Sequence, residues 1–238
     1  MPTFIAGKDN KVLFGAFDLS SFFNTANFSR EQEAVETTTF NSDQATFISG
    51  METASASLGG FFDGGTDAVD EELQAVIGAT NPTPLSIYQG GDTAGNKVVL
   101  LNSRIQNYTI DSSVGDPVGV NATFTGDNFG NGKSLYALTN TSATANTTSV
   151  DLGASSTLGG QAHLHCTAHS GANISVKIQS SADNSSFADV SGFSFTAISG
   201  TTSERIATTN TVNRYVRLVI TVTSGSATFS VGYAHNLK

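Results

Sequence analysis

Apolar and polar residues alternate along most of this chain, which is the pattern of β-strands with one buried face. The alternation is clearest at 118–125, where every second residue from Val118 to Phe124 is apolar. The segment 97–110 is longer and has an unbroken apolar run near its start, which indicates a strand that is covered on both faces there. Further strands are expected at 11–19, 34–40, 45–49, 53–62 and 85–89.

One segment, 67–78, has the spacing of a helix instead. Its apolar residues recur three and four positions apart, from Val69 to Ile77. Asp67 is the expected N-cap, and acidic residues fill the first turn, where the helix dipole favours negative charge. Gly78 stands where the helix is expected to end, because glycine commonly follows the last helical turn.

Beyond residue 150 the chain carries strand patterns only. Alternation recurs at 174–179, 193–197, 212–222 and 227–233, and the turn sequences SSADNSS and TSGS stand between these segments. Strands at such regular spacing predict an antiparallel β-sandwich. The fold class expected for the whole chain is therefore mainly β, with an N-terminal antiparallel sheet that carries one short helix and a C-terminal antiparallel β-sandwich.

Charge divides the chain unevenly. The 20 acidic residues outnumber the 11 basic residues, so the net charge is −9. Residues 1–150 hold 16 acids and six bases, a net charge of −10, whereas residues 151–238 hold four acids and five bases, a net charge of +1. The excess of acid argues against binding nucleic acid through its phosphates, because such binding needs clustered Lys and Arg.

The break in charge suggests two domains, which are expected at 1–130 and 131–238. The joint is expected in the Gly- and Asn-rich run 126–134, GDNFGNGKS, and the polar run 139–149 is the alternative. No apolar run reaches the roughly 18–20 residues of a membrane helix, and the N-terminus lacks the pattern of a signal peptide. The single cysteine, Cys166, excludes an internal disulfide. A soluble protein that is made inside the cell is therefore expected.

The histidines of AHLHCTAH, 162–169, are the sharpest candidates for chemistry. On a strand, His163, His165 and His169 would share one face and Cys166 would point to the other, where it would be a small buried apolar residue. Histidines two positions apart lie about 7 Å apart and can hold one metal ion. Because no third ligand is near, a polar surface or interface strand is the favoured interpretation, and no metal and no cofactor is assigned; His163 and His165 remain the two metal candidates.

No other motif indicates catalysis. GDNFGNGKS is unlike a phosphate-binding loop, because the glycine needed five positions before Gly132 is Asp127. No G-x-S-x-G nucleophile motif occurs. The acids Asp70, Glu71 and Glu72 are consecutive on the predicted helix, so they diverge and cannot converge on a substrate. The protein is therefore not expected to be an enzyme.

The first 126 residues resemble the tail tube, or major tail, proteins of tailed bacteriophages. The resemblance lies in DLS at 18–20, ETTTF at 36–40 and ISGMETASASLGGFFD at 48–63, followed by the helix and by VGVNATFTG at 118–126. These are features of a fold and do not form a catalytic signature. The second half is similar to β-sandwich modules appended to phage virion proteins, through 180–190 and 213–236.

This resemblance implies a structural protein of the virion tail, made in the host cytoplasm. Tail tube subunits form hexameric rings in which each contributes an antiparallel sheet to one continuous barrel, and the rings stack head to tail. The implied partners are copies of the same chain and other tail and connector proteins, with no membrane anchoring. DNA would pass through a negatively lined channel during ejection without specific binding, because acids give no counterion-release gain. The C-terminal sandwich would sit outside as a decoration.

The resemblance also nominates site residues. The loop-rich stretch 36–49 is the candidate for ring-to-ring contact. The expected channel strands are 11–19, 53–62, 97–110 and 116–125. The acids expected to line the channel are Glu52, Asp63, Asp111 and Asp116. The residues expected to contact the next ring are Glu36, Thr37, Thr38, Thr39, Phe40 and Asn41.

Three other functions compete with this hypothesis. The first is that the C-terminal sandwich is a glycan- or host-surface-binding module. Against it, the chain has no Trp and only five Tyr that could stack against a sugar. The second is another virion decoration or connector protein. A metal hydrolase using His163 and His165 ranks last.

Overall fold

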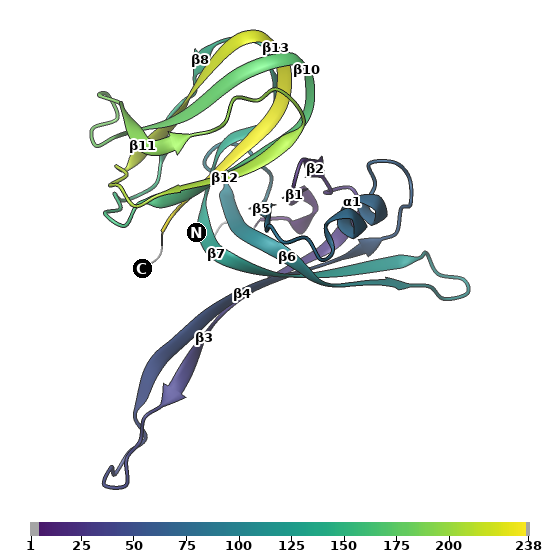
Figure 1. Cartoon of the computed structure of the whole chain (residues 1–238), viewed down its shortest axis with the longest axis vertical. Helices are drawn as coiled ribbons and strands as arrows, with labels where there is room; N and C mark the ends of the chain where they lie inside the picture. Colours follow the sequence, from purple (N-terminus) through teal and green to yellow (C-terminus); the bar gives the residue numbers. More distant parts are fainter. Residues whose placement is uncertain (1–4, 237–238) are drawn as a thin grey trace.

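The computed structural model describes residues 5–236 of the chain. Within this range it is mainly β, with a single α-helix, and every strand pair is antiparallel. Figure 1 shows two long hairpins that extend from a sheet below and a β-sandwich above it. The predicted mainly-β fold class is confirmed, and the sheet of the single chain is not closed into a barrel.

The N-terminal half pairs its strands in the order β3-β4-β7-β6-β5-β1-β2. The predicted strand 97–110 is confirmed as β6, whereas the predicted segments 45–49 and 53–62 lie on one long strand, β4. The elements are the 3-10 helix η1 (Gly7–Asp9), β1 (Lys11–Phe14), β2 (Phe17–Asp18), β3 (Phe23–Glu36), β4 (Phe47–Phe61), α1 (Val69–Val76), β5 (Thr83–Gln89), β6 (Lys97–Asp111) and β7 (Gly119–Thr141).

The alternating residues of β4 and β7 form the floor of the N-terminal core. Leu58 pairs with Ala122 and Ala56 pairs with Phe124, and all four side chains are buried. Helix α1 covers this face of the sheet, because its buried residues belong to the same apolar cluster. Burying such a face is favourable by about 25 cal/mol for each Å² of apolar surface removed from water. The pattern that predicted a half-buried strand at 118–125 is thus explained by this core.

Helix α1 begins later than predicted. Its N-cap is Ala68, without a side-chain hydrogen bond, so the prediction that Asp67 caps the helix is wrong. Asp67 lies one residue earlier in a left-handed conformation (φ 58°), and its amide donates to Oε2 of Glu71 at 2.9 Å. The side chain of Glu71, in the first turn of the helix, therefore binds the backbone of the loop that precedes it. Gly78 does follow the helix, with φ 79°, as predicted.

Strand β7 runs unbroken through residues 126–134, where the joint between the two domains was expected. Glycine marks close packing here: a Cβ on Gly132 would collide with the carbonyl oxygen of Tyr233 on the neighbouring strand, and one on Gly130 would lie 2.6 Å from Nε2 of Gln161. A turn and a close approach both favour glycine, so the local sequence did not distinguish them. The chain therefore passes directly from the sheet into the sandwich along β7.

The C-terminal half is built around two long paired strands, β10 and β13. The predicted turn TSGS at 223–226 is wrong, because β13 continues through it. Gly225 (φ 65°) lies against Gly171 (φ 56°) of β10, and the two strands curve together over the top of the sandwich (Figure 1). The strands are β8 (Ala145–Asn146), β9 (Val150–Asp151), β10 (Gly160–Ser181), β11 (Ala188–Ser194), β12 (Thr202–Thr208) and β13 (Tyr215–His235).

Candidate assembly surface

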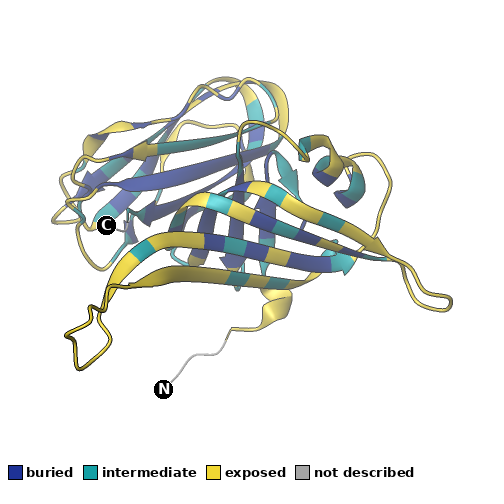
Figure 2. Cartoon of the chain, turned by 60° about the horizontal axis from the view of Figure 1, so that its bottom comes forward, coloured by how far each residue is buried: buried dark blue, intermediate teal, exposed yellow. Residues whose placement is uncertain are grey.

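One face of the sheet formed by β3, β4, β7 and the outer half of β6 carries small neutral polar side chains; we call it the polar face. Residues Ala56 and Leu58 face the core, so alternation turns Ser55 and Ser57 to the opposite side. Figure 2 shows this alternation of buried and exposed positions along the strands. Neighbouring pairs extend the polar face with Asn27, Ser29, Thr53, Asn107, Thr109, Asn121, Thr123 and Thr125.

Few charges interrupt the polar face. Asp111 lies on it and its Oδ2 accepts a hydrogen bond from Nδ2 of Asn121 at 3.0 Å. Glu31 pairs with Thr53 on the same side. Arg104 is the basic residue there, and its Nη1 lies 3.1 Å from Oδ2 of Asp127. The polar face is thus dominated by hydroxyl and amide groups, with acids as a minority.

The four acids predicted to line a channel do not lie together. Asp111 is on the polar face, but Glu52 is on the opposite face, where it forms an ion pair with Arg30. The hydrogen bond from Arg30 lowers the pKa of the Glu52 carboxyl. Asp63 lies in the loop after β4, where its Oδ1 accepts a hydrogen bond from the Gly65 amide at 2.9 Å, and Asp116 lies in the loop between β6 and β7.

The same four-stranded sheet has two open edges. Among the described residues, β3 pairs only with β4. β6 pairs with β5 as far as Ser103, and its outer half, 104–111, pairs only with β7 in the described range. Open edges present unpaired N–H and C=O groups to any strand that approaches. The sheet can therefore be extended on both sides.

The hairpin of β3 and β4 extends beyond the core as a two-stranded ribbon, residues 31–53, which we call the arm (Figure 1). It carries large exposed apolar side chains: Phe47 is 60% exposed, Ile48 57% and Met51 77%. Two-stranded ribbons are marginally stable alone, and clustered exposed apolar groups mark contact surfaces. The arm is therefore a candidate for contact with another molecule.

The residues predicted to contact a stacked ring, Glu36 to Asn41, form the tip of the arm. β3 ends at Glu36, and local hydrogen bonds hold the turn: the Thr37 amide donates to the Thr46 carbonyl at 2.7 Å, and the Thr46 amide donates to Oγ1 of Thr38 at 3.1 Å. Thr39, Phe40 and Asn41 are exposed at the end of the hairpin. The stretch 36–49, expected to be loop-rich, is partly strand because β4 begins at Phe47.

The two metal candidates are buried where the sandwich meets the N-terminal half. His165 Nδ1 donates to the Gly15 carbonyl at 2.7 Å, and Ser86 Oγ lies 2.7 Å from His165 Nε2 and 3.3 Å from His163 Nδ1. Ser86 has one proton, so it donates to His165 and accepts from His163. Burial lowers the pKa of His165 to about 4 and lowers the pKa of His163 well below its usual value, the latter with help from His165 and Arg205. Both rings are therefore neutral at pH 7.

The third histidine lies apart from this pair. A β-bulge between Cys166 and Ala168 shifts the register, so His169 lies opposite Ala227, on the face of Cys166. The expectation that it shares a face with His163 and His165 is wrong, and its side chain is exposed. Among residues 5–236, no three His, Cys, Asp or Glu side chains are grouped to hold a metal ion.

Two hydrogen bonds that join separate elements had no clear signal in the sequence. Tyr108 Oη donates to Oδ1 of Asp70 at 2.7 Å and so ties α1 to β6. Burial raises the pKa of Tyr108, and the contact with Asp70 raises it further. Tyr88 Oη lies 2.8 Å from Oγ of Ser230 and joins the two halves. A polar group inside an otherwise apolar strand is the only local sign of such an interface. Within the described chain, no helix is long and apolar enough to cross a membrane.

No protein-family model and no curated protein matches the chain. Several solved structures are similar. A chain from the virion of a native gene transfer agent particle is 17% identical, with a TM-score of 0.40 over 51% of this chain and 93% of that one. The SPP1 tail tube is 12% identical, with a TM-score of 0.44 over 53% of this chain and 78% of that one.

A third structure spans nearly the whole chain. The SPP1 Dit protein, described as a paradigm of the hub adsorption apparatus in phages that infect Gram-positive bacteria, is 13% identical, with a TM-score of 0.38 over 94% of this chain and 98% of that one. All three TM-scores are below 0.5. The similar structures nevertheless include tail tubes, the class of protein that the sequence resemblance names.

Proposed function

We propose that this chain is a virion structural protein whose copies join edge to edge into a ring of a phage-type tail tube. The observation that carries the proposal is the pair of open edges, β3 and the outer half of β6, on opposite sides of one four-stranded sheet. The order β3-β4-β7-β6 is antiparallel throughout, so β6 of one copy placed beside β3 of the next continues the alternation. Closing the ring would remove the exposed edges.

The ring number comes from the family resemblance. Six copies of four strands each make a barrel of about 24 strands, which is wide enough to leave an open channel, because barrel diameter grows with strand number. The contact is heterologous, since the β3 edge of one copy meets the β6 edge of the next. Such contacts form a closed ring only if the rotation from one copy to the next adds up to a full turn. Rings stacked through the arms would then form the tube.

In this arrangement the polar face lines the channel. Helix α1 and strands β1 and β5 cover the other side of the sheet, which leaves the polar face free to point inward. Its hydroxyl and amide groups, with Asp111 and Glu31 among them, present no cluster of bases to DNA phosphates. DNA could therefore pass without being held. Asp63 and Asp116 would lie at the rims and Glu52 outside the lining.

The remaining surfaces take the other roles of a tube subunit. The apolar side chains of the arm and its tip, Glu36 to Asn41, would contact the next ring. The predicted units 1–130 and 131–238 would divide the work, the first forming rings and the second decorating the outside. Other tail and connector proteins would meet the ends of the stack in the virion.

A charge-repulsion experiment tests the ring seam. Ser29 on β3 and Thr109 on β6 both lie on the polar face at the two open edges. A ring brings these edges together, so the double substitution Ser29→Lys/Thr109→Lys adds a positive charge to each of the two strands that meet at the seam, and this repulsion opposes their pairing. We expect rings or tubes from the wild-type chain in negative-stain microscopy and sedimentation, and monomers from the double variant.

Two matched variants make the result specific. Ser29→Glu/Thr109→Lys places opposite charges across the same seam and is expected to assemble. Ser57→Lys changes the same face on β4, which lies inside the sheet, and should leave the edges free to pair. A wild-type chain that stays monomeric at all concentrations tested, or a double-lysine variant that assembles as well as wild type, would contradict the proposed seam.

A further inference from the structure

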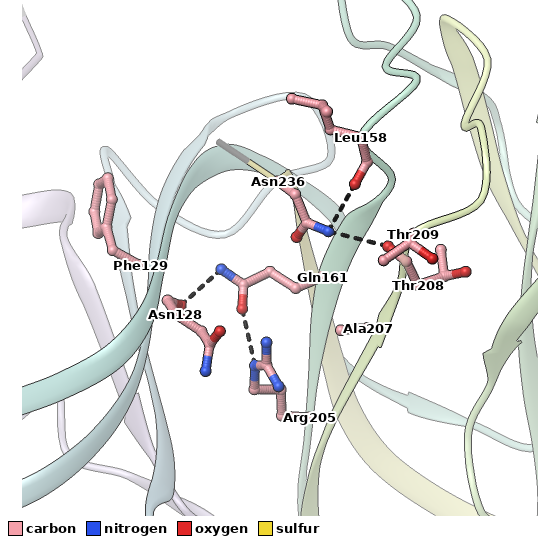
Figure 3. A pocket seen from close by; sticks show the side chains of 9 residues that line it. All are labelled: Asn128, Phe129, Leu158, Gln161, Arg205, Ala207, Thr208, Thr209 and Asn236. Carbon is pink, nitrogen blue, oxygen red and sulfur yellow. Dashed lines mark hydrogen bonds between the residues drawn. The ribbon is translucent and has the colours of Figure 1, made fainter. Parts of the chain in front are cut away.

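A pocket of about 650 Å³ opens where the sandwich meets β7. Its walls come from β7, from the beginning of β10, from β12 and from the end of the described chain (Figure 3). A volume of this size is within the usual range of small-molecule sites, about 300–1,000 Å³. The lining residues are Asn128, Phe129, Leu158, Gln161, Arg205, Ala207, Thr208, Thr209 and Asn236.

Arg205 is the one charged residue in this lining. Its Nε donates to Oε1 of Gln161 at 2.9 Å, and Nε2 of Gln161 donates to the carbonyl of Asn128 at 2.7 Å (Figure 3). Gln161 is buried and its side-chain amide is bonded at both Oε1 and Nε2, so its orientation is fixed. It therefore also fixes the orientation of the guanidinium group. The positive charge is thus presented by a rigid support.

The guanidinium group has spare donors and no counterion. Within residues 5–236, neither Nη atom of Arg205 makes a hydrogen bond, and no carboxylate lies within salt-bridge distance of it. Arg205 is half-buried, and this burial lowers its pKa. Charged groups that leave water are usually paired. The empty pair of donors therefore points to a partner that comes from outside the chain.

We propose that this cavity, the Arg205 pocket, binds a small carboxylate. A carboxylate matches the planar fork of a guanidinium group through two parallel hydrogen bonds. The side-chain amide of Asn128 and the hydroxyl of Thr209 form no hydrogen bond to described residues, and both lie in the lining, where they can bind the rest of the ligand. Leu158 adds an apolar side chain to the lining.

The neighbouring Asp127 favours a singly charged ligand over a phosphate. Its negative charge acts on Arg205, although it forms its ion pair with Arg104 at 3.1 Å. A phosphate group with a charge of −1.5 to −2 would meet more repulsion from this carboxylate than a carboxylate ligand does. The pocket also holds no lysine, which is a common partner of phosphate.

Isothermal titration calorimetry on the full chain tests the proposal with two carboxylate sources. Glucuronate is compared with glucose, and a tripeptide with a free carboxyl end is compared with the same peptide amidated. We expect at least one acid to bind and its neutral counterpart to bind about tenfold more weakly or not at all, because a charge-assisted bidentate contact is lost. The acid that binds identifies the source as a sugar acid or a peptide end.

Variants of the full chain assign the binding to Arg205. Arg205→Gln is expected to weaken the acid about tenfold or more, and Arg205→Lys should also weaken it, because lysine keeps the charge but lacks the fork. Arg214→Gln removes the same charge outside the pocket and should bind as wild type. The proposal is overturned if neither acid binds, if neutral and acidic ligands bind equally, or if Arg205→Gln, shown to be folded by circular dichroism, binds as wild type. None of these results depends on ring formation.

Discussion

Acidification can protonate His165, which lies in the buried contact between β10 and the N-terminal half. At neutral pH, His165 accepts a hydrogen bond from Ser86 and donates one to the Gly15 carbonyl. A second proton on its ring would remove the acceptor at Nε2 and place a charge in a buried site beside His163. We therefore expect the folded chain to lose stability as the pH falls below the ordinary histidine pKa.

The magnitude follows from the two pKa values of His165. Burial lowers the pKa from 6.5 to about 4 in the folded chain. Between these values the unfolded chain binds the proton and the folded chain does not, so the free energy of unfolding falls as pH falls through this window. A difference of about 2.5 pH units corresponds to about 3 kcal/mol, fully present above pH 6.5 and lost by about pH 4. His163 and His235, whose pKa values are also lowered by burial, add losses of the same sign.

Urea unfolding followed by circular dichroism at several pH values between 7 and 4.5 measures this loss. His165→Gln should flatten the pH dependence, because glutamine stays neutral and keeps polar atoms in the site. His169→Gln, at the exposed histidine on the same strand, is the matched control and should follow wild type. The paired carboxylates, whose pKa values are lowered in the folded chain, contribute the same pH dependence to wild type and to His165→Gln, so the difference between the two proteins isolates His165. Identical pH dependence in wild type and His165→Gln would refute the assignment of a buried neutral ring.

Two further perturbations test the packing and the arm. Gly132→Ala should destabilise the chain by about 2 kcal/mol or more in urea unfolding, because the added Cβ collides with the Tyr233 carbonyl and the two paired backbones must separate. An unchanged unfolding midpoint would mean that β7 and β13 are not packed so closely. The double substitution Phe47→Ser/Met51→Ser should leave the monomer within about 0.5 kcal/mol of wild type, because both side chains are exposed, while it shortens tubes seen by microscopy. Tubes of wild-type length would remove the arm from the stacking contact.

Local pattern was sufficient for part of this architecture. The apolar start of 97–110 matches β6, because a strand buried on both faces needs apolar residues at consecutive positions. The single helix was found from its spacing, since the face toward the core must recur every three to four residues. Its cap was missed, because Asp67 is one position too early and bonds through its amide to Glu71 instead.

Glycine-rich stretches were the main source of error. The run 126–134 and the TSGS sequence at 223–226 have turn composition, yet both lie inside continuous strands. Glycine serves tight turns and close backbone contacts equally, and only the neighbour across the ladder distinguishes them. That neighbour is Tyr233 for Gly132 and Gly171 for Gly225, each far away along the chain.

The alternation and composition of this chain are enough to specify a mainly antiparallel β protein with one helix and an acidic first half, because hydrophobic burial imposes a period on each element separately. The tertiary structure alone decided which edges stay open, that Glu52 faces Arg30 while Asp111 faces the polar side, and that Arg205 lacks a counterion within the described chain. Those properties depend on the register between strands and on contacts between distant segments. The local sequence around one residue of such a contact does not indicate which distant residue it will meet.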